Sequence, residues 1–304
     1  MVVVAAALAV LSVLLADPVP RLLGRARWPH RDPIAGLLLW QAIGLAAGLS
    51  LCGCFFVIGL HRLGQSLPEA LIALINNLVR GDPLRMISVI DGVSIGIGVA
   101  LSLRLFWGLA RSLFRVLRVR RAHRHALNIL ATPWPNDPGV LMLDHPMAVA
   151  YCLPGIKSRL VISSGATERL TSAELGAVIV HEKAHLTSRH DLVVLPFVAW
   201  GVALPFVVGV RRAQASVALL VEMMADDAVI KAGLGVALER ALRTMRPEFI
   251  GGLGGVEYEV ASEVRAVRVA AVSQRRRRYR WLAILASFAL LAMPTAALIG
   301  PAFF

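Results

Sequence analysis

The sequence is short of the residues on which soluble and disulfide-stabilised proteins depend. Charged residues make up only 17% of the 304 positions, and there are three cysteines. Cys52 and Cys54 lie inside a long apolar segment and Cys152 lies far outside it, so neither a structural disulfide nor a cysteine metal site is expected. Apolar residues instead make up 57% of the chain, and its mean hydropathy is +0.70. This composition is too apolar for an ordinary soluble domain.

The chain also lacks any basic stretch interleaved with aromatic residues and any recognised nucleic-acid motif. Its net charge is nevertheless +13. The arginines responsible cluster at the ends of apolar segments, where anionic lipid headgroups attract them. We therefore expect no direct nucleic-acid binding.

Four segments are apolar enough to be membrane spans. Three are long, at about Ile34–Leu60, Met86–Ala110 and Trp281–Phe304. The fourth, Met1–Ala16, is short and would be completed by residues 19–23. A cleaved signal peptide is its alternative, but the segment has no basic start. The sequence predicts three transmembrane helices with short loops in residues 1–110 and a last one in 281–304.

The distribution of arginine predicts the orientation in the membrane. Arginines are concentrated at residues 21–31, 111–124 and 275–280, whereas the loop over 62–85 is poorer in basic residues. Because basic loops stay on the cytoplasmic side, we expect a multi-pass plasma-membrane protein. Both termini would lie outside, and residues 111–280 would form a cytoplasmic domain. The basic stretch Arg120–His125 is interpreted as solvated and membrane-facing.

Residues 192–210 do not fit this simple alternation. They are nearly all apolar, but a single crossing would separate the two halves of the metal site described below. Pro196 and Pro205 also disfavour a straight span. A bent hairpin is predicted, lying at the inner leaflet or packed inside the domain.

His181-Glu182-Lys183-Ala184-His185 reads HExxH, the most informative motif of the chain. Histidines four residues apart on a helix project from one face and can bind one Zn²⁺. Glu182 would then reach the water on that metal and act as general base.

The flanking residues support a helix at this position. Thr171-Ser172-Ala173-Glu174 fits a capping box, and the apolar residues that follow it repeat at helical spacing. Residues 159–164 are predicted to form a strand before that helix. A strand beside the metal helix is where a zinc peptidase commonly adds its substrate as a further strand.

A catalytic zinc site needs a third protein ligand, and two residues compete for this role. Asp191 lies six residues after His185, but the glycine that such a spacing requires is replaced by Ser188. Glu222 is favoured. Asp226 lies one helical turn further on, where it could hydrogen-bond a ligating imidazole. The alternative for this pair is an acidic patch on a solvated helix.

Taken together, these motifs resemble the BlaR/MecR family of integral-membrane metallopeptidases, and most closely its short actinobacterial members. The resemblance is carried by Leu143-Asp144-His145-Pro146, Ala150–Gly155, Ser164-Gly165, HExxH with Arg189-His190, and Glu222-xxx-Asp226. It implies a gluzincin-like fold with His181, His185 and Glu222 as zinc ligands. It also implies a role in inducible antibiotic resistance, in which a cytoplasmic winged-helix repressor of the BlaI/MecI type is cleaved.

Antibiotic-sensing members carry a penicillin-binding domain after the last span, and this chain ends at Phe304. Direct β-lactam sensing is therefore not expected. The fold expected is an α-helical membrane protein with an α+β gluzincin-like cytoplasmic metallopeptidase domain. Its expected partners are the lipid bilayer and a winged-helix repressor. The sequence does not decide whether the chain forms a homodimer. The alternatives are an HtpX-like quality-control protease and a non-catalytic membrane receptor or adaptor.

Overall fold

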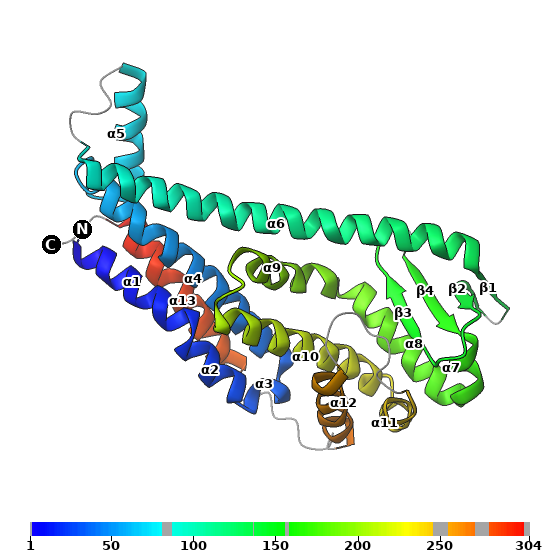
Figure 1. Ribbon diagram of the computed structural model, residues 1–304. Coiled ribbons are helices and arrows are strands. Elements are labelled where there is room, and N and C mark those ends of the chain that lie inside the picture. Colours follow the sequence, from blue (N-terminus) through cyan, green and yellow to red (C-terminus); the bar gives the residue numbers. More distant parts are fainter. Residues whose placement is uncertain are drawn as a thin grey trace.

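The computed structural model describes residues 2–80, 87–135, 137–155, 158–245, 255–270 and 280–300. It is mostly helical, with one small sheet (Figure 1). The helices are α1 (Val2–Ala16), α2 (Pro18–Arg25), α3 (Trp28–Arg31), α4 (Pro33–Leu60), α5 (Leu67–Arg80), α6 (Val89–Leu130), α7 (Ser164–Arg169), α8 (Ser172–Thr187), α9 (His190–Ala203), α10 (Val208–Lys231), α11 (Gly235–Thr244), α12 (Gly255–Ala270) and α13 (Arg280–Ile299). The strands are β1 (Ala131–Trp134), β2 (Asp137–Leu143), β3 (Ala150–Leu153) and β4 (Arg159–Ser163). The arginines at 275–278 and the span ends predicted at Met86 and at 301–304 lie outside the described residues.

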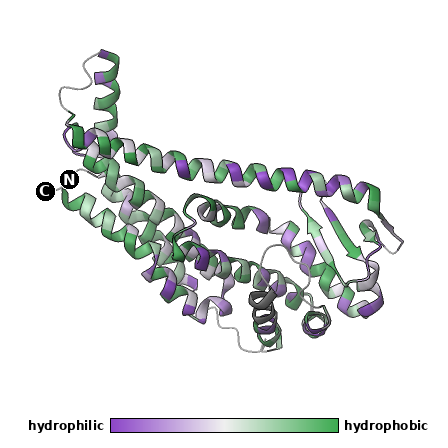
Figure 2. Cartoon of the chain, viewed as in Figure 1, coloured by the Kyte–Doolittle hydropathy of each residue, from purple (hydrophilic) through white to green (hydrophobic). Residues whose placement is uncertain are grey.

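Four helical segments are long and apolar enough to cross a membrane. They are Val2–Arg25, Pro33–Leu60, Val89–Leu130 and Arg280–Ile299, one for each predicted span. Their apolar character is visible along the bundle formed by α1, α4, α13 and the start of α6 (Figure 2). Both termini lie at the same end of this bundle, near α5, and the sheet lies far from them (Figure 1). These helices suggest a multi-pass membrane protein, and which end faces the cytoplasm stays a prediction.

Helix α6 does not end where the third span was predicted to end. It continues without a break from Ala110 to Leu130, so the predicted division at residues 110/111 falls inside one helix. In this continuation Arg120 donates to Asp191 at 3.0 Å and Arg124 donates to the carbonyl of Pro154 at 3.0 Å. Arg121, Ala122, His123 and His125 are exposed, as predicted, whereas Arg120 and Arg124 form polar contacts with residues distant in the sequence. That this stretch faces a membrane stays a prediction.

The apolar segment 192–210 forms a bent hairpin, as predicted. Helix α9 ends at Ala203, the chain turns, and α10 begins at Val208. Pro196 lies inside α9, and Pro205 lies in the turn, where it has no helical hydrogen bond to break. The position of the hairpin relative to a membrane stays a prediction.

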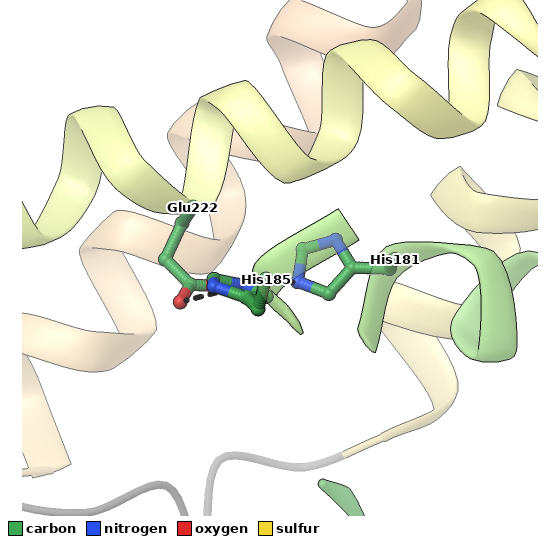
Figure 3. A group of neighbouring side chains, drawn as sticks. All are labelled: His181, His185 and Glu222. Atoms are coloured by element: carbon green, nitrogen blue, oxygen red, sulfur yellow. Dashed lines mark hydrogen bonds and ion pairs between the residues drawn. The ribbon is translucent and has the colours of Figure 1, made fainter. Parts of the chain in front are cut away.

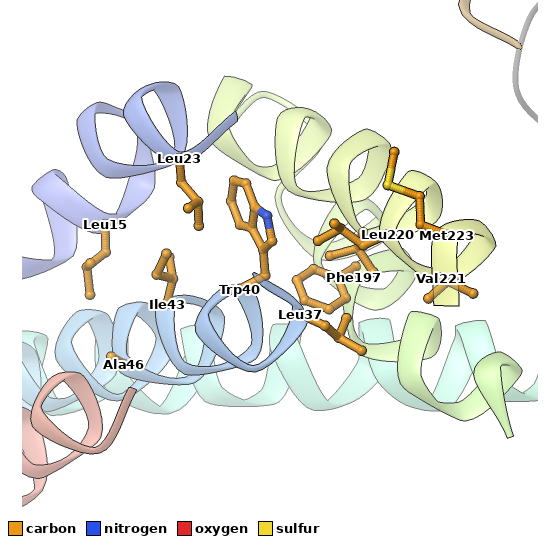
Figure 4. Packing of buried hydrophobic residues seen from close by; sticks show 11 residues of the cluster. Leu15, Leu23, Leu37, Trp40, Ile43, Ala46, Phe197, Leu220, Val221 and Met223 are labelled. Atoms are coloured by element: carbon orange, nitrogen blue, oxygen red, sulfur yellow. The ribbon is translucent and has the colours of Figure 1, made fainter. Parts of the chain in front are cut away.

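A buried apolar cluster holds this hairpin against the bundle. Trp40 of α4, Phe197 of α9 and Leu220 of α10 meet in it, and each is at most 3% exposed (Figure 4). Val221 and Met223 belong to the same cluster, so α10 is packed on either side of residue 222. Close packing of this kind stabilises helices within a membrane by van der Waals contact.

The sheet has the order β1-β2-β4-β3, with β2 and β4 parallel and the other pairs antiparallel. The strand predicted over residues 159–164 is β4, but it is paired on both sides. The edge strand on this side of the sheet is β3, which contacts α8. A substrate strand would therefore add to β3 rather than to the strand recognised in the sequence. The sequence pattern identified β4 because it is buried and rich in branched residues.

Candidate metal centre

Helix α8 presents the HExxH motif from a well-defined start. Thr171 accepts the backbone N–H of Glu174, and the Glu174 carboxylate accepts the backbone N–H of Thr171, which confirms the predicted capping box. Leu175 and Val178 then pack into the cluster that covers the sheet. His181 follows on the next turn and is only 6% exposed.

Helix α10 brings the third side chain. Glu222 and Asp226 lie one turn apart on it, as the sequence predicted. The Glu222 carboxylate faces the two imidazoles of α8 (Figure 3). Asp226 is fully buried. A solvated acidic patch, the alternative reading of this pair, does not describe these positions.

The distances between the three side chains fit a zinc ion. His181 Nε2 and His185 Nε2 are 3.1 Å apart, and they lie 3.3 and 3.5 Å from the nearer oxygens of Glu222. Four ligands in a tetrahedron at about 2.0–2.1 Å from zinc are roughly 3.4 Å from one another. Two imidazole nitrogens and a carboxylate also form a ligand set known for catalytic zinc. These residues therefore fit the metal that the motif implies.

Each imidazole has a close neighbour at its other nitrogen. Asp226 lies where it was predicted, with its Oδ1 3.1 Å from His181 Nδ1, but this contact is an ion pair without hydrogen-bond geometry. His185 Nδ1 lies 3.0 Å from Nδ1 of His190, the first residue of α9. Such partners fix the orientation of ligating histidines and the nitrogen that carries the proton.

The turn between α8 and α9 makes the His190 contact possible. Arg189 has a left-handed backbone with φ of 50°, which is unfavourable for a residue with a side chain. This turn separates the two helices and places His190 against His185. Asp191, the competing ligand, is directed to Arg120 instead and is not part of the three-residue group.

Arg265 of α12 completes the surroundings and was not identified from the sequence. Its guanidinium donates to both oxygens of Asp226 at 2.7 and 2.9 Å, and it lies 2.9 Å from Glu222 Oε2. Arg265 is only 3% exposed. It lies 39 residues from Asp226 in the chain, and no motif connects the two. His190 was noted in the sequence only as part of a motif. Its contact with His185 spans a break between two helices, so helical spacing could not predict it.

Burial and neighbouring charges shift the pKa values of the three candidate ligands in different directions. Burial lowers the pKa of His185 to about 4, so this imidazole is neutral, as a metal ligand must be. Burial alone would lower the pKa of His181, but Asp226 and Glu222 raise it to about 9. Burial would raise the pKa of Glu222, but Arg265 and His181 hold it well below its usual range.

Glu182 stands apart from the three candidate ligands. Burial raises the pKa of its carboxyl to about 7, with Glu222 adding to the rise and His181 opposing it. The thiol and backbone of Cys152, on the edge strand β3, interact with this carboxylate. A carboxyl group with a pKa near neutrality can both accept and donate a proton at physiological pH. The site therefore combines three side chains that could hold a metal ion with a separate carboxyl group of raised pKa beside a sheet edge.

Comparison with known proteins agrees with this geometry. Residues 118–245 match the profile of peptidase family M48. The match spans the end of α6, the sheet and the helices α7 to α11, and it contains His181, Glu182, His185, Glu222 and Asp226. No curated protein and no solved structure matches the chain. The match covers less than half of the chain, and together with the His-His-Glu group it suggests a metallopeptidase in this part of it.

Proposed function

We propose that the protein is a membrane-bound zinc endopeptidase. His181, His185 and Glu222 are the proposed ligands, and Glu182 is the proposed general base. The observation that carries the proposal is the spacing of the three ligand atoms, 3.1 to 3.5 Å, with an additional carboxylate of raised pKa on the same helix. A receptor or adaptor that only binds would have no use for Glu182.

The chain's own residues supply the proton transfers. When bound, zinc would act as a Lewis acid toward the scissile carbonyl and the attacking water. A Glu182 carboxylate oxygen accepts a proton from that water and delivers it to the leaving amine nitrogen. Asp226 and His190 keep the two imidazoles in place during these steps.

The edge strand β3 offers a place for the substrate backbone. It is hydrogen-bonded to β4 on one side, lies against α8, and brings Cys152 to the carboxylate of Glu182. An extended peptide added to this edge would pass directly beside the proton-transferring group. This arrangement supports cleavage within a polypeptide.

The proposed substrate is a cytoplasmic winged-helix repressor of the BlaI/MecI type, which the motif resemblance implies. The family match is to M48 as a whole. This favours one second candidate, a quality-control protease of membrane proteins similar to HtpX. The two candidate functions predict different fates for the repressor in cells: the first cleaves it, and the second leaves it intact.

The first experiment compares Glu182→Gln with the wild-type full-length protein in detergent, loaded with zinc. The amide keeps the size of the side chain but cannot accept the proton, so hydrolysis of an unfolded protein substrate should fall by roughly 10²–10⁴-fold. Zinc content should stay the same. Glu168→Gln is the matched control, because it removes the same charge from an exposed position on α7. Equal activity in all three proteins would refute the general-base assignment.

The second experiment follows the repressor in cells. Under inducing stress it should be cleaved in the wild-type strain and persist at full length with Glu182→Gln, as judged by immunoblot. Turnover of misassembled membrane proteins with an intact repressor would select the quality-control alternative. Equal processing in both strains would show that the chain is not the protease.

The proposed orientation can be tested by reporter fusions. Fusions after Arg27 and Arg124 should report the cytoplasm, and one at Asn76 of α5 should report the exterior. A cytoplasmic signal at Asn76 would reverse the orientation and exclude a cytoplasmic substrate.

A further inference from the structure

An apolar cavity of about 320 Å³ lies between the bundle and the α9–α10 hairpin. Its walls come from α1, α4, α6, α9, α10 and the turn between the last two. Ser12 is the one hydroxyl-bearing residue of the lining, and its hydroxyl already donates to the carbonyl of Ala9 at 2.8 Å. Water needs several polar partners in a cavity, so this one suits an aliphatic occupant. Its volume is in the range of small-ligand pockets.

Small residues on α4 shape one wall. A Cβ on Gly48 would lie 3.1 Å from the ring of Trp200, so the glycine allows the indole to lie against α4. Trp200 and Trp40 both line the cavity. At the other end Gly209 approaches the carbonyl of Ala16 so closely that no side chain would fit there. The cavity is thus built by close approaches between elements distant in sequence.

Positive charge gathers at one end of the cavity. Arg21 and Arg212 both pair with Asp17. This group adjoins the lining, because Ala16 precedes Asp17, Pro20 precedes Arg21 and Ala213 follows Arg212. Two arginines against one aspartate leave one positive charge in excess. An apolar space below a cationic rim is complementary to an anionic phospholipid.

The cavity wall continues into the metal centre. Helix α9 begins at His190, which contacts His185, and α10 carries Glu222. Phe197 lines the cavity and belongs to the buried cluster that includes Val221 and Met223, the neighbours of Glu222 (Figure 4). The hairpin is also tied across its length, because Gln214 donates to the carbonyl of Phe197 at 3.0 Å. An occupant of the cavity would therefore support the same two helices that hold the triad.

We propose that this cavity binds one acyl chain of an anionic phospholipid, with the phosphate held by Arg21 and Arg212. The bound lipid supports the α9–α10 hairpin and thereby the geometry of the metal centre. The lipid site stands on the cavity and its charged rim alone. Its effect on hydrolysis rests on the proposed peptidase function.

Lipid binding can be measured by native mass spectrometry of the full-length protein released from detergent. Phosphatidylglycerol and phosphatidylcholine with identical acyl chains are titrated separately. The wild type should retain one phosphatidylglycerol in preference to phosphatidylcholine. Ala47→Phe places a ring in the cavity and should weaken retention by at least about tenfold. Leu49→Phe is the control, because it adds a ring at an exposed position of the same helix.

The headgroup contact has its own matched pair. Arg21→Gln should remove most of the preference for phosphatidylglycerol. Arg118→Gln, at an exposed position on α6, removes the same charge elsewhere and should not. Thermal unfolding in the same detergent verifies each fold, and Val210→Phe replaces Ala47→Phe if the latter does not fold. Unchanged retention in a folded cavity-filling variant, or equal retention of the two lipids by the wild type, would overturn the proposal.

Peptidase activity in nanodiscs separates the two proposals. Hydrolysis should be higher in phosphatidylglycerol than in phosphatidylcholine for the wild type and for Leu49→Phe, but not for Ala47→Phe. If the zinc-loaded protein hydrolyses nothing in either lipid, the peptidase proposal fails while the retention measurements still decide the lipid site. If activity is present but equal in both lipids and all variants, the regulatory part of the inference is wrong.

Discussion

Two buried aspartates in different parts of the molecule, Asp226 and Asp91, each contact a histidine and an arginine. Of the two, Asp226 lies beside the group that could hold a metal ion. The partners are His181 and Arg265 for Asp226, and His61 and Arg62 for Asp91. Asp226 and Asp91 are both at most 3% exposed. The same three residue types therefore produce two different kinds of site.

The difference lies in what surrounds each trio. The Asp91 carboxylate accepts the backbone N–H of Ser88 and caps α6, while His61 Nδ1 lies 2.7 Å from the carbonyl of Ile58. Among the described residues, the three-ligand group is formed by His181, His185 and Glu222 alone. A carboxylate, an imidazole and a guanidinium thus make a helix cap in one place. Chelation additionally requires a second histidine on the same helix face and a carboxylate from a facing helix.

The largest expected effect is that of Glu222→Ala on zinc. Loss of a ligand should lower zinc affinity by more than the roughly 10–100-fold contributed by a partner outside the ligand set. Metal analysis after dialysis should find little zinc in this variant. Asp91→Ala and Asp191→Ala should keep most of theirs. Zinc loss in Asp191→Ala alone would exclude the His-His-Glu assignment.

Arg265→Gln should have the next largest effect, and it should depend on zinc. Without metal the variant leaves the buried carboxylate of Asp226 beside the partly buried carboxylate of Glu222. Removing one partner of a buried ion pair typically costs about 3–5 kcal/mol. Bound zinc supplies positive charge to Glu222, so the substitution should lower the stability of the zinc-loaded protein less than that of the metal-free protein. The rise in melting temperature on adding zinc should therefore be larger than in wild type. Arg268→Gln is the control, because Arg268 lies on the same helix but pairs with Asp227. Its melting temperature should rise on adding zinc by as much as that of the wild type.

Asp226→Ala should weaken zinc binding without abolishing it. The side chain contacts His181 Nδ1 and is not a ligand itself, so a decrease of roughly 10–100-fold is expected. Competition with a chelator of known affinity measures this decrease. An effect as large as that of Glu222→Ala would mean that Asp226 coordinates the metal directly.

The smallest effect is expected at the cap of α6. Ser88→Ala removes the hydroxyl that accepts the backbone N–H of Asp91, and loss of such a cap costs about 1 kcal/mol. Thermal unfolding in detergent should detect the change, while zinc affinity stays at the wild-type value. A change in zinc affinity would contradict the view that the Asp91 cluster is purely structural.

Much of the fold and of the site could be predicted from the sequence where the relevant residues are close together in it. The capping box of α8, the i,i+4 spacing of His181 and His185 and that of Glu222 and Asp226 are each fixed within one helix. A helix of known pitch places such residues on one face whatever the rest of the chain does. The four long apolar helices follow from composition in the same way.

The tertiary structure alone decided the contacts between distant segments. Arg265 reaches Asp226 across 39 residues, and Arg120 reaches Asp191 across 71. The sequence also gave no means of recognising β3, rather than β4, as the sheet edge beside α8, because strand order depends on how the whole sheet assembles. Local spacing is dictated by backbone geometry, whereas long-range pairing depends on which buried charges and apolar faces find partners when the helices pack. The sequence by itself therefore determined the candidate ligands and the candidate general base, and packing decided what orients them and where a substrate and a lipid could approach.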